Sequence, residues 1–285
     1  AAAALFRVRH RRFSCLLTAN VGDRLIPALN LIRQFGLVRR AALLAHREPT
    51  PRFVRAHGQL PTAVAAVNRR IAGHFEGGQY GRVEVFYGVT DAERFLQPRP
   101  AKPESEPIDF CLIGDLNSAW KGADLAVEGF RLMEPAVAAG CRLHLASFRE
   151  ERSSGDPRIL CYRWMPFEEM PAFLGRMDVM LVLSRDEGVM RETFSQAAVQ
   201  GMLAGLPLIV TDLPILTEKV NEGGGLIIRA KEELAAAMMR MARDPGLRRR
   251  MGEAARATAR ARYLWRTDTF LERFCGEPAS PGGTP

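Results

Sequence analysis

Short apolar runs alternate with longer segments of helical spacing from about residue 108 onward. The runs have the length of strands and cover Asp109 to Ile113, Arg142 to Ala146, Ile159 to Trp164, Val179 to Leu183, Leu208 to Asp212 and Gly225 to Arg229. Helices are predicted over Ala123 to Ala139, Phe167 to Arg176, Thr193 to Gly205 and from Lys231 to the end. Strands alternating with helices of about 10 to 15 residues are typical of a parallel, doubly wound α/β sheet.

The pattern before residue 98 is weaker but of the same kind. Strands are predicted over Phe13 to Thr18, Ala41 to Ala45 and Val83 to Tyr87, and helices over Leu25 to Phe35 and Thr62 to Phe75. These few elements predict a second, partial α/β lobe. Pro98 to Pro107 is rich in proline and charge and predicts an interdomain linker. We therefore expect an N-terminal lobe over residues 1–99, a linker over 100–107, and a C-terminal lobe over 108–285 that includes the C-terminal helices.

Composition indicates an ordinary globular protein that buries a full core. Of the 285 residues, 47% are hydrophobic and 25% are charged. No run of 18 uncharged apolar residues predicts a membrane span, and the start does not form a clean signal peptide. The five cysteines lack CxxC spacing, which favours buried thiols in a reducing, cytoplasmic compartment over disulfides or a zinc site.

The net charge of +8 is concentrated in two segments, Arg7 to Arg12 and Arg248 to Arg266. The second segment lies on an alanine-rich predicted helix, so a solvated helix face is the simpler interpretation. The alternative is attraction to an anionic membrane surface, peripherally at the inner face, or to an acidic substrate. Nucleic acid is disfavoured as a partner because no aromatic residues interleave the arginines.

Several catalytic signatures do not occur in the sequence. It contains no GxxxxGK[ST], GxGxxG after a strand, GxSxG or HExxH, so phosphate-loop, dinucleotide, serine-hydrolase and zinc-protease interpretations lose their usual support. It also has no Asp-x-Asp, so a carboxylate-bound Mg²⁺ is not suggested, and we expect no metal site.

Two loops at predicted strand ends carry the candidate chemistry. The first begins at Gly114 and ends at Lys121-Gly122 before a helix, where an ammonium group and exposed N–H groups together suit phosphate. Lysine followed by glycine is also common in simple turns. The second loop contains Glu192, followed by Thr193 as the expected N-cap and by the N–H groups of Phe194 and Ser195. A carboxylate beside N–H groups suits sugar hydroxyls, although Glu192 could equally be an acidic residue favoured at a helix start.

The second loop and the helix after it, Glu192 to Asp212, resemble the donor-site signature of GT-B glycosyltransferases of the large retaining family 4, the glycosyl transferases group 1. Further matches occur in order at Tyr87 to Phe95, Gly114 to Gly122, Leu216 to Val220 and Gly223 to Leu226. The resemblance covers roughly residues 80 to 275, and it is specific in combination. It implies two Rossmann-like lobes that face a cleft, with the nucleotide sugar bound by the C-terminal lobe and the acceptor by the N-terminal lobe.

The resemblance also implies the roles of individual residues. Lys121, beside Gly114, would bind the donor diphosphate and stabilise the leaving group. Glu192, with Thr193, Phe194 and Ser195, would hold the transferred sugar, and Gln200 would face the ribose. His46, at the end of a first-lobe strand, would face the donor sugar, although a lone histidine there is more often a surface or capping residue. The base is expected near Trp164 and Met165. Because the donor phosphate itself helps to deprotonate the acceptor, the resemblance requires no protein nucleophile and no cofactor.

The sequence departs from the family pattern at several of these positions. Gln200 replaces a glutamate, which removes charge assistance from a ribose contact. Asp115 stands where an arginine is usual, unless Arg185 or Arg191 supplies the missing charge. Tyr87 and Thr90 replace the usual asparagine and aspartate before the linker. The first lobe also lacks the glycine-rich opening strand and loop of the family.

We interpret the chain as a retaining, metal-independent glycosyltransferase that moves a sugar from a nucleotide diphosphate sugar to a glycan or lipid-linked acceptor in cell-surface polysaccharide or lipopolysaccharide biosynthesis. The pathway rests on family analogy. One alternative is a noncatalytic or truncated homologue that acts as a nucleotide-sugar-binding or partner subunit. A weaker one is a basic surface-binding protein without a nucleotide site.

Overall fold

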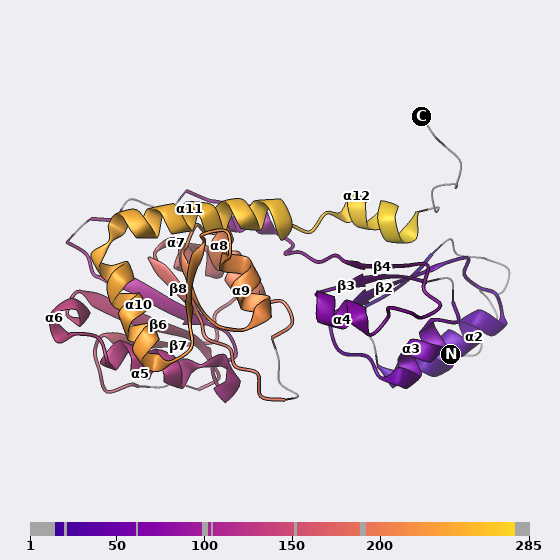
Figure 1. The fold of residues 1–285 in the computed structure, drawn as a ribbon, viewed down its shortest axis with the longest axis horizontal. Coiled ribbons are helices and arrows are strands. Elements are labelled where there is room, and N and C mark those ends of the chain that lie inside the picture. The colour runs from indigo at the N-terminus through magenta and orange to yellow at the C-terminus, as the bar shows by residue number, and fades with distance from the viewer. Residues whose placement is uncertain are drawn as a thin grey trace. The chain divides into compact units, whose positions relative to one another are not determined.

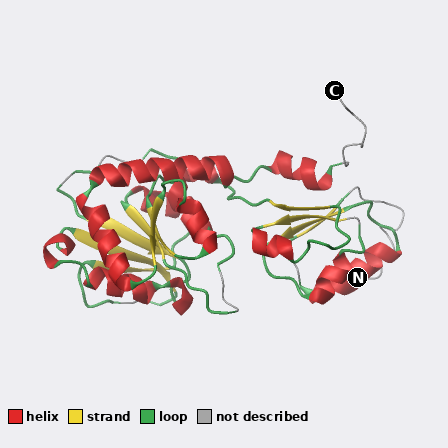
Figure 2. Cartoon of the chain, viewed as in Figure 1, coloured by secondary structure: helices red, strands yellow, loops and turns green. Residues whose placement is uncertain are grey.

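The structure is a computed structural model that describes residues 15–19, 22–60, 62–98, 102–103, 105–150, 153–188 and 192–276. These residues form two compact units (Figure 1). One unit is Val89–Leu264, and the other combines the chain up to Gly88 with the chain from Trp265. In each unit helices surround one parallel sheet (Figure 2).

The larger unit contains a six-stranded parallel sheet whose order is β10-β9-β8-β5-β6-β7. Its strands are β5 (Ile108–Ile113), β6 (Cys141–Phe148), β7 (Ile159–Arg163), β8 (Val179–Val182), β9 (Leu208–Thr211) and β10 (Gly225–Ile228). The chain proceeds outward from β5 to β7, returns to the other side of β5 with β8, and continues outward to β10. This doubly wound arrangement confirms the predicted strands, and it creates a switch point between β5 and β8.

The helices of this unit lie on both faces of the sheet. They are η2 (Ala92–Phe95), η3 (Ala119–Lys121), α5 (Ala123–Arg131), α6 (Pro135–Ala138), α7 (Met170–Gly175), α8 (Gln196–Leu203), α9 (Pro214–Val220), α10 (Lys231–Arg243) and α11 (Pro245–Arg262). Strand β8 shows how its side chains alternate between the faces. Val179 and Leu181 join the core formed by α5 and α10, whereas Met180 lies so close to Gly201 of α8 that a Cβ atom there would overlap its sulfur.

The predicted helix over Ala123 to Ala139 is wrong in one respect, because it is two helices. Pro135 begins α6, and the preceding Glu134 has an extended ψ of 128°. Proline disfavours the helical conformation of the residue before it, so α5 ends and α6 starts anew. Helix α7 is also shorter than the predicted Phe167 to Arg176, because it begins at Met170.

The smaller unit contains a four-stranded parallel sheet in the order β1-β2-β3-β4. Its strands are β1 (Leu16–Thr18), β2 (Ala41–Ala45), β3 (Thr62–Ala66) and β4 (Arg82–Val85). Its helices are η1 (Asp23–Leu25), α2 (Ile26–Gln34), α3 (Pro51–His57), α4 (Arg69–Gly73), α12 (Thr267–Phe270) and the π-helical turn η4 (Leu271–Cys275).

The prediction of a helix over Thr62 to Phe75 is wrong, because its first half is the inner strand β3. Small apolar residues such as Ala63 to Ala66 fit a buried strand as well as a helix, and β3 is hydrogen-bonded on both sides, to β2 and β4. The helix in this segment begins only at Arg69, where the Asn68 side chain accepts a hydrogen bond of 2.9 Å from the N–H of Ile71.

The end of the described chain belongs to the smaller unit, which differs from the predicted assignment of all C-terminal helices to the larger lobe. Phe270 and Phe274, from α12 and η4, are buried in one cluster with Ala42 of β2 and Ala65 of β3. The alanines leave room for the aromatic rings on the face of the sheet that α2, α3 and α4 do not cover (Figure 1).

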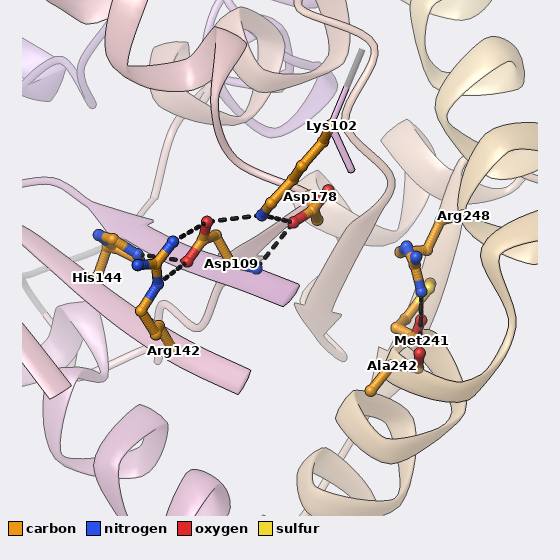
Figure 3. A network of polar contacts seen from close by, with 8 residues as sticks. All are labelled: Lys102, Asp109, Arg142, His144, Asp178, Met241, Ala242 and Arg248. Atoms are coloured by element: carbon orange, nitrogen blue, oxygen red, sulfur yellow. Dashed lines mark hydrogen bonds and ion pairs between the residues drawn. The ribbon is translucent and has the colours of Figure 1, made fainter. Parts of the chain in front are cut away.

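A network of charged residues joins the linker to the amino end of the larger sheet (Figure 3). Lys102 of the linker contacts Asp109 at 2.6 Å and Asp178 at 2.5 Å. Asp109 also accepts hydrogen bonds from Arg142 at 2.7 Å and contacts His144 at 2.8 Å. Although burial acts in the opposite direction, these donors hold the pKa of Asp109 well below its usual range. Every charge in the network therefore has an opposite partner.

Candidate active site

The two loops predicted to carry chemistry lie side by side at the switch point of the larger sheet. Strands β5 and β8 are hydrogen-bonded neighbours, and Gly114 and Ser184 follow them closely at their carboxyl ends. The loops enclose a cavity of about 190 Å³, whose lining includes Gly114, Asp115, Lys121, Ser184, Glu192 and Ser195. The carboxyl ends of strands at a switch point are where open α/β sheets bind ligands.

Lys121 lies inside this cavity, with 19% of its side chain exposed. Its ammonium nitrogen is 2.7 Å from Oε2 of Glu192 and 4.1 Å from the centre of the Trp120 ring. The adjacent Gly122 has φ = +76°, and a Cβ atom there would overlap the carbonyl oxygen of Leu183. Glycine therefore permits the two loops to approach closely and brings the lysine to the carboxylate.

Glu192 is the centre of the polar contacts in the cavity, and its side chain is 9% exposed. One carboxylate oxygen accepts from Lys121 and from Oγ of Ser184 at 3.0 Å, and the other accepts from the N–H of Ser195 at 3.1 Å. The carbonyl of Ser184 in turn accepts from Thr211 Oγ1 at 2.5 Å. The carboxylate is thus held in one orientation by three donors from two loops, the one after β5 and the one between β8 and α8.

The start of α8 differs from the prediction in its details. Helix α8 begins at Gln196, and its N-cap is Ser195 in the left-handed conformation with φ = 60°, so the prediction of Thr193 as N-cap is wrong. The N–H of Ser195 donates to Glu192 rather than pointing out of the helix. Phe194 is only 5% exposed and packs against Tyr263, with 5.8 Å between ring centres. This segment is shaped by tertiary contacts that side-chain propensity does not reveal.

The structure does not bring every predicted residue into this cavity. Gln200 lies on the second turn of α8 with 8% exposure, and it is not among the residues that line the cavity. Met165 follows β7 at the same carboxyl edge of the sheet and is half-buried. His46 follows β2 in the smaller unit and is also half-buried. The roles of these three residues stay predictions.

Asp115, which replaces the expected arginine, has partners within its own neighbourhood. A hydrogen bond of 3.1 Å from Asn117, together with contacts from Ser118 and Arg149, lowers the pKa of Asp115. Arg185 does not replace the arginine, because its guanidinium group donates to the carbonyl of Ala119 at 2.7 Å and pairs with Asp124 outside the cavity. Arg191, the other candidate, lies outside the described residues.

Three residues at the site were not predicted from the sequence, namely Trp120, Ser184 and Arg149. Ser184 directly follows the apolar run of β8, so its position at a strand end was a signal that could have identified it. Arg149 comes from the loop after β6 and lies 3.3 Å from Asp115, across a gap of 34 positions in the chain. The sequence contains no signal for that contact.

The described part of the chain also bears on metal binding, membrane crossing and the role of the basic helix α11. Among those residues, no three His, Cys, Asp or Glu side chains gather in a way that could hold a metal ion. No helix within the same ranges is both long enough and apolar enough to cross a membrane. Three arginines of α11 have structural partners: Arg248 donates to the end of α10, Arg256 to the end of α8, and Arg262 to Glu222.

The fold and the position of the site define a class of protein. Solved structures with the same fold include a glycosyltransferase from Rickettsia africae ESF-5, with a TM-score of 0.69 at 15% identity over 92% of this chain and 76% of that chain. HepE (Alr3699) of Anabaena in complex with UDP-glucose gives a TM-score of 0.65 at 15% identity, over 92% of this chain and 78% of HepE. WaaG, a glycosyltransferase involved in lipopolysaccharide biosynthesis, gives a TM-score of 0.54 at 11% identity, over 84% of this chain and 78% of WaaG. The fold is therefore GT-B, as predicted.

The family comparison narrows this class. Residues 107–244 match the family described as glycosyl transferases group 1. The match includes both loops of the candidate site, from Gly114 to Ser195. Among curated proteins, no sequence gives a significant match.

Proposed function

We propose that this protein is a retaining, metal-independent glycosyltransferase of the family 4 type. It moves a sugar from a nucleotide diphosphate sugar to a glycan or lipid-linked acceptor in cell-surface polysaccharide or lipopolysaccharide assembly. The observation that carries the proposal is the pair formed by Lys121 and Glu192, 2.7 Å apart in a cavity at the switch point of a group 1 domain. A cation for phosphate and a carboxylate for sugar hydroxyls are adjacent there.

Lys121 supplies the positive charge of the proposed reaction. The bond between the anomeric carbon and the donor phosphate oxygen breaks, and the nucleoside diphosphate leaves with the electron pair. The ammonium group stabilises the charge that develops on that oxygen. The acceptor hydroxyl forms the new bond on the same face of the sugar and transfers its proton to the departing phosphate. No metal, cofactor or protein nucleophile takes part.

Glu192 orients the transferred sugar in this proposal. Its carboxylate accepts hydrogen bonds from sugar hydroxyls, while Ser184 and the N–H of Ser195 keep it in place. Thr193 and Phe194 complete the sugar-binding segment, and Gln200 faces the ribose. Met165 lies by the base, and His46 approaches the sugar from the other lobe. The larger unit binds the donor, and the smaller unit binds the acceptor.

The structural neighbours support the choice of donor and pathway. HepE of Anabaena was solved with UDP and glucose and with UDP-glucose, and WaaG takes part in lipopolysaccharide biosynthesis. A lipid-linked acceptor would place the enzyme in the cytoplasm, in peripheral contact with the inner membrane face through its basic segments. Both Arg7 to Arg12, outside the described residues, and the exposed Arg249 of α11 can provide that attraction.

The proposal is tested first by binding and then by turnover. A thermal-shift panel of UDP, GDP, ADP and their sugar conjugates, each with EDTA and with Mg²⁺, should show one selective shift that EDTA does not change. A ligand at about a hundred times its dissociation constant adds roughly 2.7 kcal/mol to the free energy of unfolding. The sugar-labelled form of that donor is then incubated with membrane extract, and the anomeric configuration of the product is measured by NMR.

Each outcome of the two experiments has a distinct meaning. Transfer with retained configuration in EDTA supports the whole proposal, whereas inversion or a requirement for Mg²⁺ contradicts the proposed mechanism. Binding without transfer identifies a noncatalytic nucleotide-sugar-binding subunit. The absence of a shift with every nucleotide contradicts the donor site itself.

A further inference from the structure

Lys219 is a lysine that the structure buries completely, against the ring of Phe194 in the segment that leads into the candidate site. It lies on α9, and its side chain is 0% exposed. Its ammonium nitrogen is 4.8 Å from the ring centre of Phe194 and 4.7 Å from that of Tyr263. The same nitrogen donates to the carbonyl of Ile215 at 3.2 Å and lies 3.6 Å from the half-exposed carboxylate of Glu218.

Burial of this ammonium group is costly for the fold. Desolvation lowers the pKa of Lys219 to about 8, against smaller opposing effects of Glu218 and Glu192. At this buried position, lysine contributes less to stability than an apolar side chain of similar length would, because a buried charge loses its hydration. The presence of Lys219 therefore calls for a role other than stability.

The contacts of Lys219 lead to the segment that holds Glu192. Phe194 lies two residues after Glu192 and immediately before Ser195, whose left-handed conformation directs its N–H to the Glu192 carboxylate. A serine with φ = 60° keeps that conformation only when its surroundings enforce it. Lys219 holds the ring of Phe194 from one side, and Tyr263, at the end of α11, packs against both.

We propose that Lys219 is a positioning residue for sugar transfer: its ammonium group fixes Phe194 and thereby keeps Ser195 and Glu192 in the geometry that holds the donor sugar. This role rests on the proposed function. It is carried by the placement of one buried cation against two aromatic rings that also pack against each other, one of which belongs to the sugar-binding segment. The attraction between a desolvated cation and an aromatic face is strong enough to order such a segment.

The charged and titratable groups that face Lys219 determine how its role depends on pH. They are Glu218 on α9, Glu192 in the site loop and Tyr263 at the end of α11. Burial raises the pKa of Tyr263 to about 12, so that ring stays neutral when Lys219 titrates. Loss of the proton from Lys219 above about pH 8 removes the attraction to Phe194, and the hold on the sugar weakens in that range.

The test compares Lys219→Met with Lys231→Met in the full chain. Lys231 is an exposed lysine whose ion pair with Glu128 lies away from the site, so it controls for the loss of a lysine. Amide hydrogen exchange of the peptide that covers residues 192–199 is measured without ligand. Affinities are measured for UDP and UDP-glucose, or for the nucleotide pair that gives the largest thermal shift in the panel above.

For Lys219→Met we expect a folded protein of equal or higher thermal stability and faster exchange at residues 193–196. Affinity for the sugar nucleotide should fall about tenfold, the factor that corresponds to a desolvated cation–π contact, while affinity for the free diphosphate stays unchanged. The parent should show the same selective loss between pH 7 and pH 9. Lys219→Met, or Lys219→Gln if the methionine variant does not fold, should show no such pH dependence, which assigns the loss to Lys219.

Two results would overturn the proposal. Unchanged exchange at residues 193–196 would show that Lys219 does not order the segment. Equal loss of affinity for the diphosphate and its sugar conjugate, together with lower thermal stability, would show a purely structural role. If the parent binds no nucleotide at all, the proposed function fails, and the exchange comparison still decides the role of Lys219.

Discussion

The two ends of the six-stranded sheet both contain a lysine paired with a carboxylate, but they differ in what surrounds the pair. At the amino end, Lys102 contacts Asp109 at 2.6 Å within a network whose charges are all paired (Figure 3). At the carboxyl end, Lys121 contacts Glu192 at 2.7 Å beside a cavity. The amino-end pair attaches the linker to the sheet, whereas the carboxyl-end pair lines a cavity that a ligand can enter.

Cavity size does not identify the functional end of the sheet. A larger cavity of about 310 Å³ lies at the amino end, lined by Asp178 and by arginines of α11. Two of these arginines donate to helix ends: Arg248 to the carbonyl of Ala242 and Arg256 to that of Ala204. Their positive charges therefore lie at the carboxyl ends of α10 and α8, where the helix dipoles are negative. The comparison teaches that a candidate site is recognised by polar groups that can exchange their protein partners for a ligand, as Lys121 and Glu192 can. These groups lie at the switch point of the sheet, where Gly122 and Ser195 have positive φ.

The largest expected effect comes from Lys121→Met. Removal of the ammonium group should lower transfer by about 10²–10³-fold, because a preorganised charge at the leaving group is lost. The thermal midpoint should change little, since the lysine is partly exposed and its loss leaves Glu192 with two other donors. Transfer rates with the labelled donor provide the measurement. Activity within a few fold of the parent would contradict the assignment of Lys121 to the diphosphate.

Asp109→Asn, at the amino end of the sheet, should lower stability and leave transfer unchanged, which is the reverse of the effect expected for Lys121→Met. Removal of one buried charge leaves Lys102 and Arg142 without their shared partner, which should lower the free energy of unfolding by about 3 kcal/mol. Chemical denaturation measures this loss, and transfer per folded molecule should stay at the parental rate. A stable variant that has lost activity would show that the network belongs to the active site.

The same variant has a defined dependence on pH. The folded-state pKa of Asp109 lies below its unfolded value, so its stabilising contribution is complete above about pH 4 and is lost as the pH falls below that value. The difference in stability between the parent and Asp109→Asn should therefore shrink on acidification. A difference that stays constant from pH 7 to pH 3 would contradict the charge-based account of the network.

Gly122→Ala should disturb the carboxyl end through the backbone. A Cβ atom at φ = +76° is strained, and it overlaps the Leu183 carbonyl, so we expect a loss of roughly 2 kcal/mol in stability together with weaker donor binding. Gly175→Ala in α7 is the matched control, because nothing lies within 4 Å of its added Cβ atom. Equal behaviour of the two variants in denaturation and binding would show that the close approach of the loops is unimportant.

The smallest expected effect is that of Arg149→Ala. Its guanidinium group is exposed, so its loss should weaken donor binding by less than about fivefold, with the effect diminished by salt. The physical reason is that Asp115 then stands unneutralised beside the diphosphate position. Titration of the double variant Asp115→Asn with Arg149→Ala should recover the parental affinity. No recovery would show that Arg149 contacts the donor itself.

The sequence predicted the sheet of the larger unit well, because its strands are short, mainly apolar runs between helices, and the inner strands β8 and β9 are buried almost completely. Lys121 and Glu192 could also be predicted, since strand ends at a switch point are recognisable from the order of elements. Thr62 to Ala66 was misjudged because small apolar residues carry no clear period. The contacts of Ser195 with Glu192, Arg149 with Asp115, and Phe270 with the smaller sheet depend on tertiary approach that local pattern does not contain.

The most direct test of the account is titration of the preferred nucleotide sugar onto the parent, Lys121→Met and Asp109→Asn, followed by thermal unfolding. We predict that Asp109→Asn starts from a lower midpoint but gains the same ligand-induced shift as the parent. Lys121→Met should start near the parental midpoint and gain little. The reverse result, with ligand stabilisation lost in Asp109→Asn and retained in Lys121→Met, would place the donor at the amino end of the sheet and contradict the account.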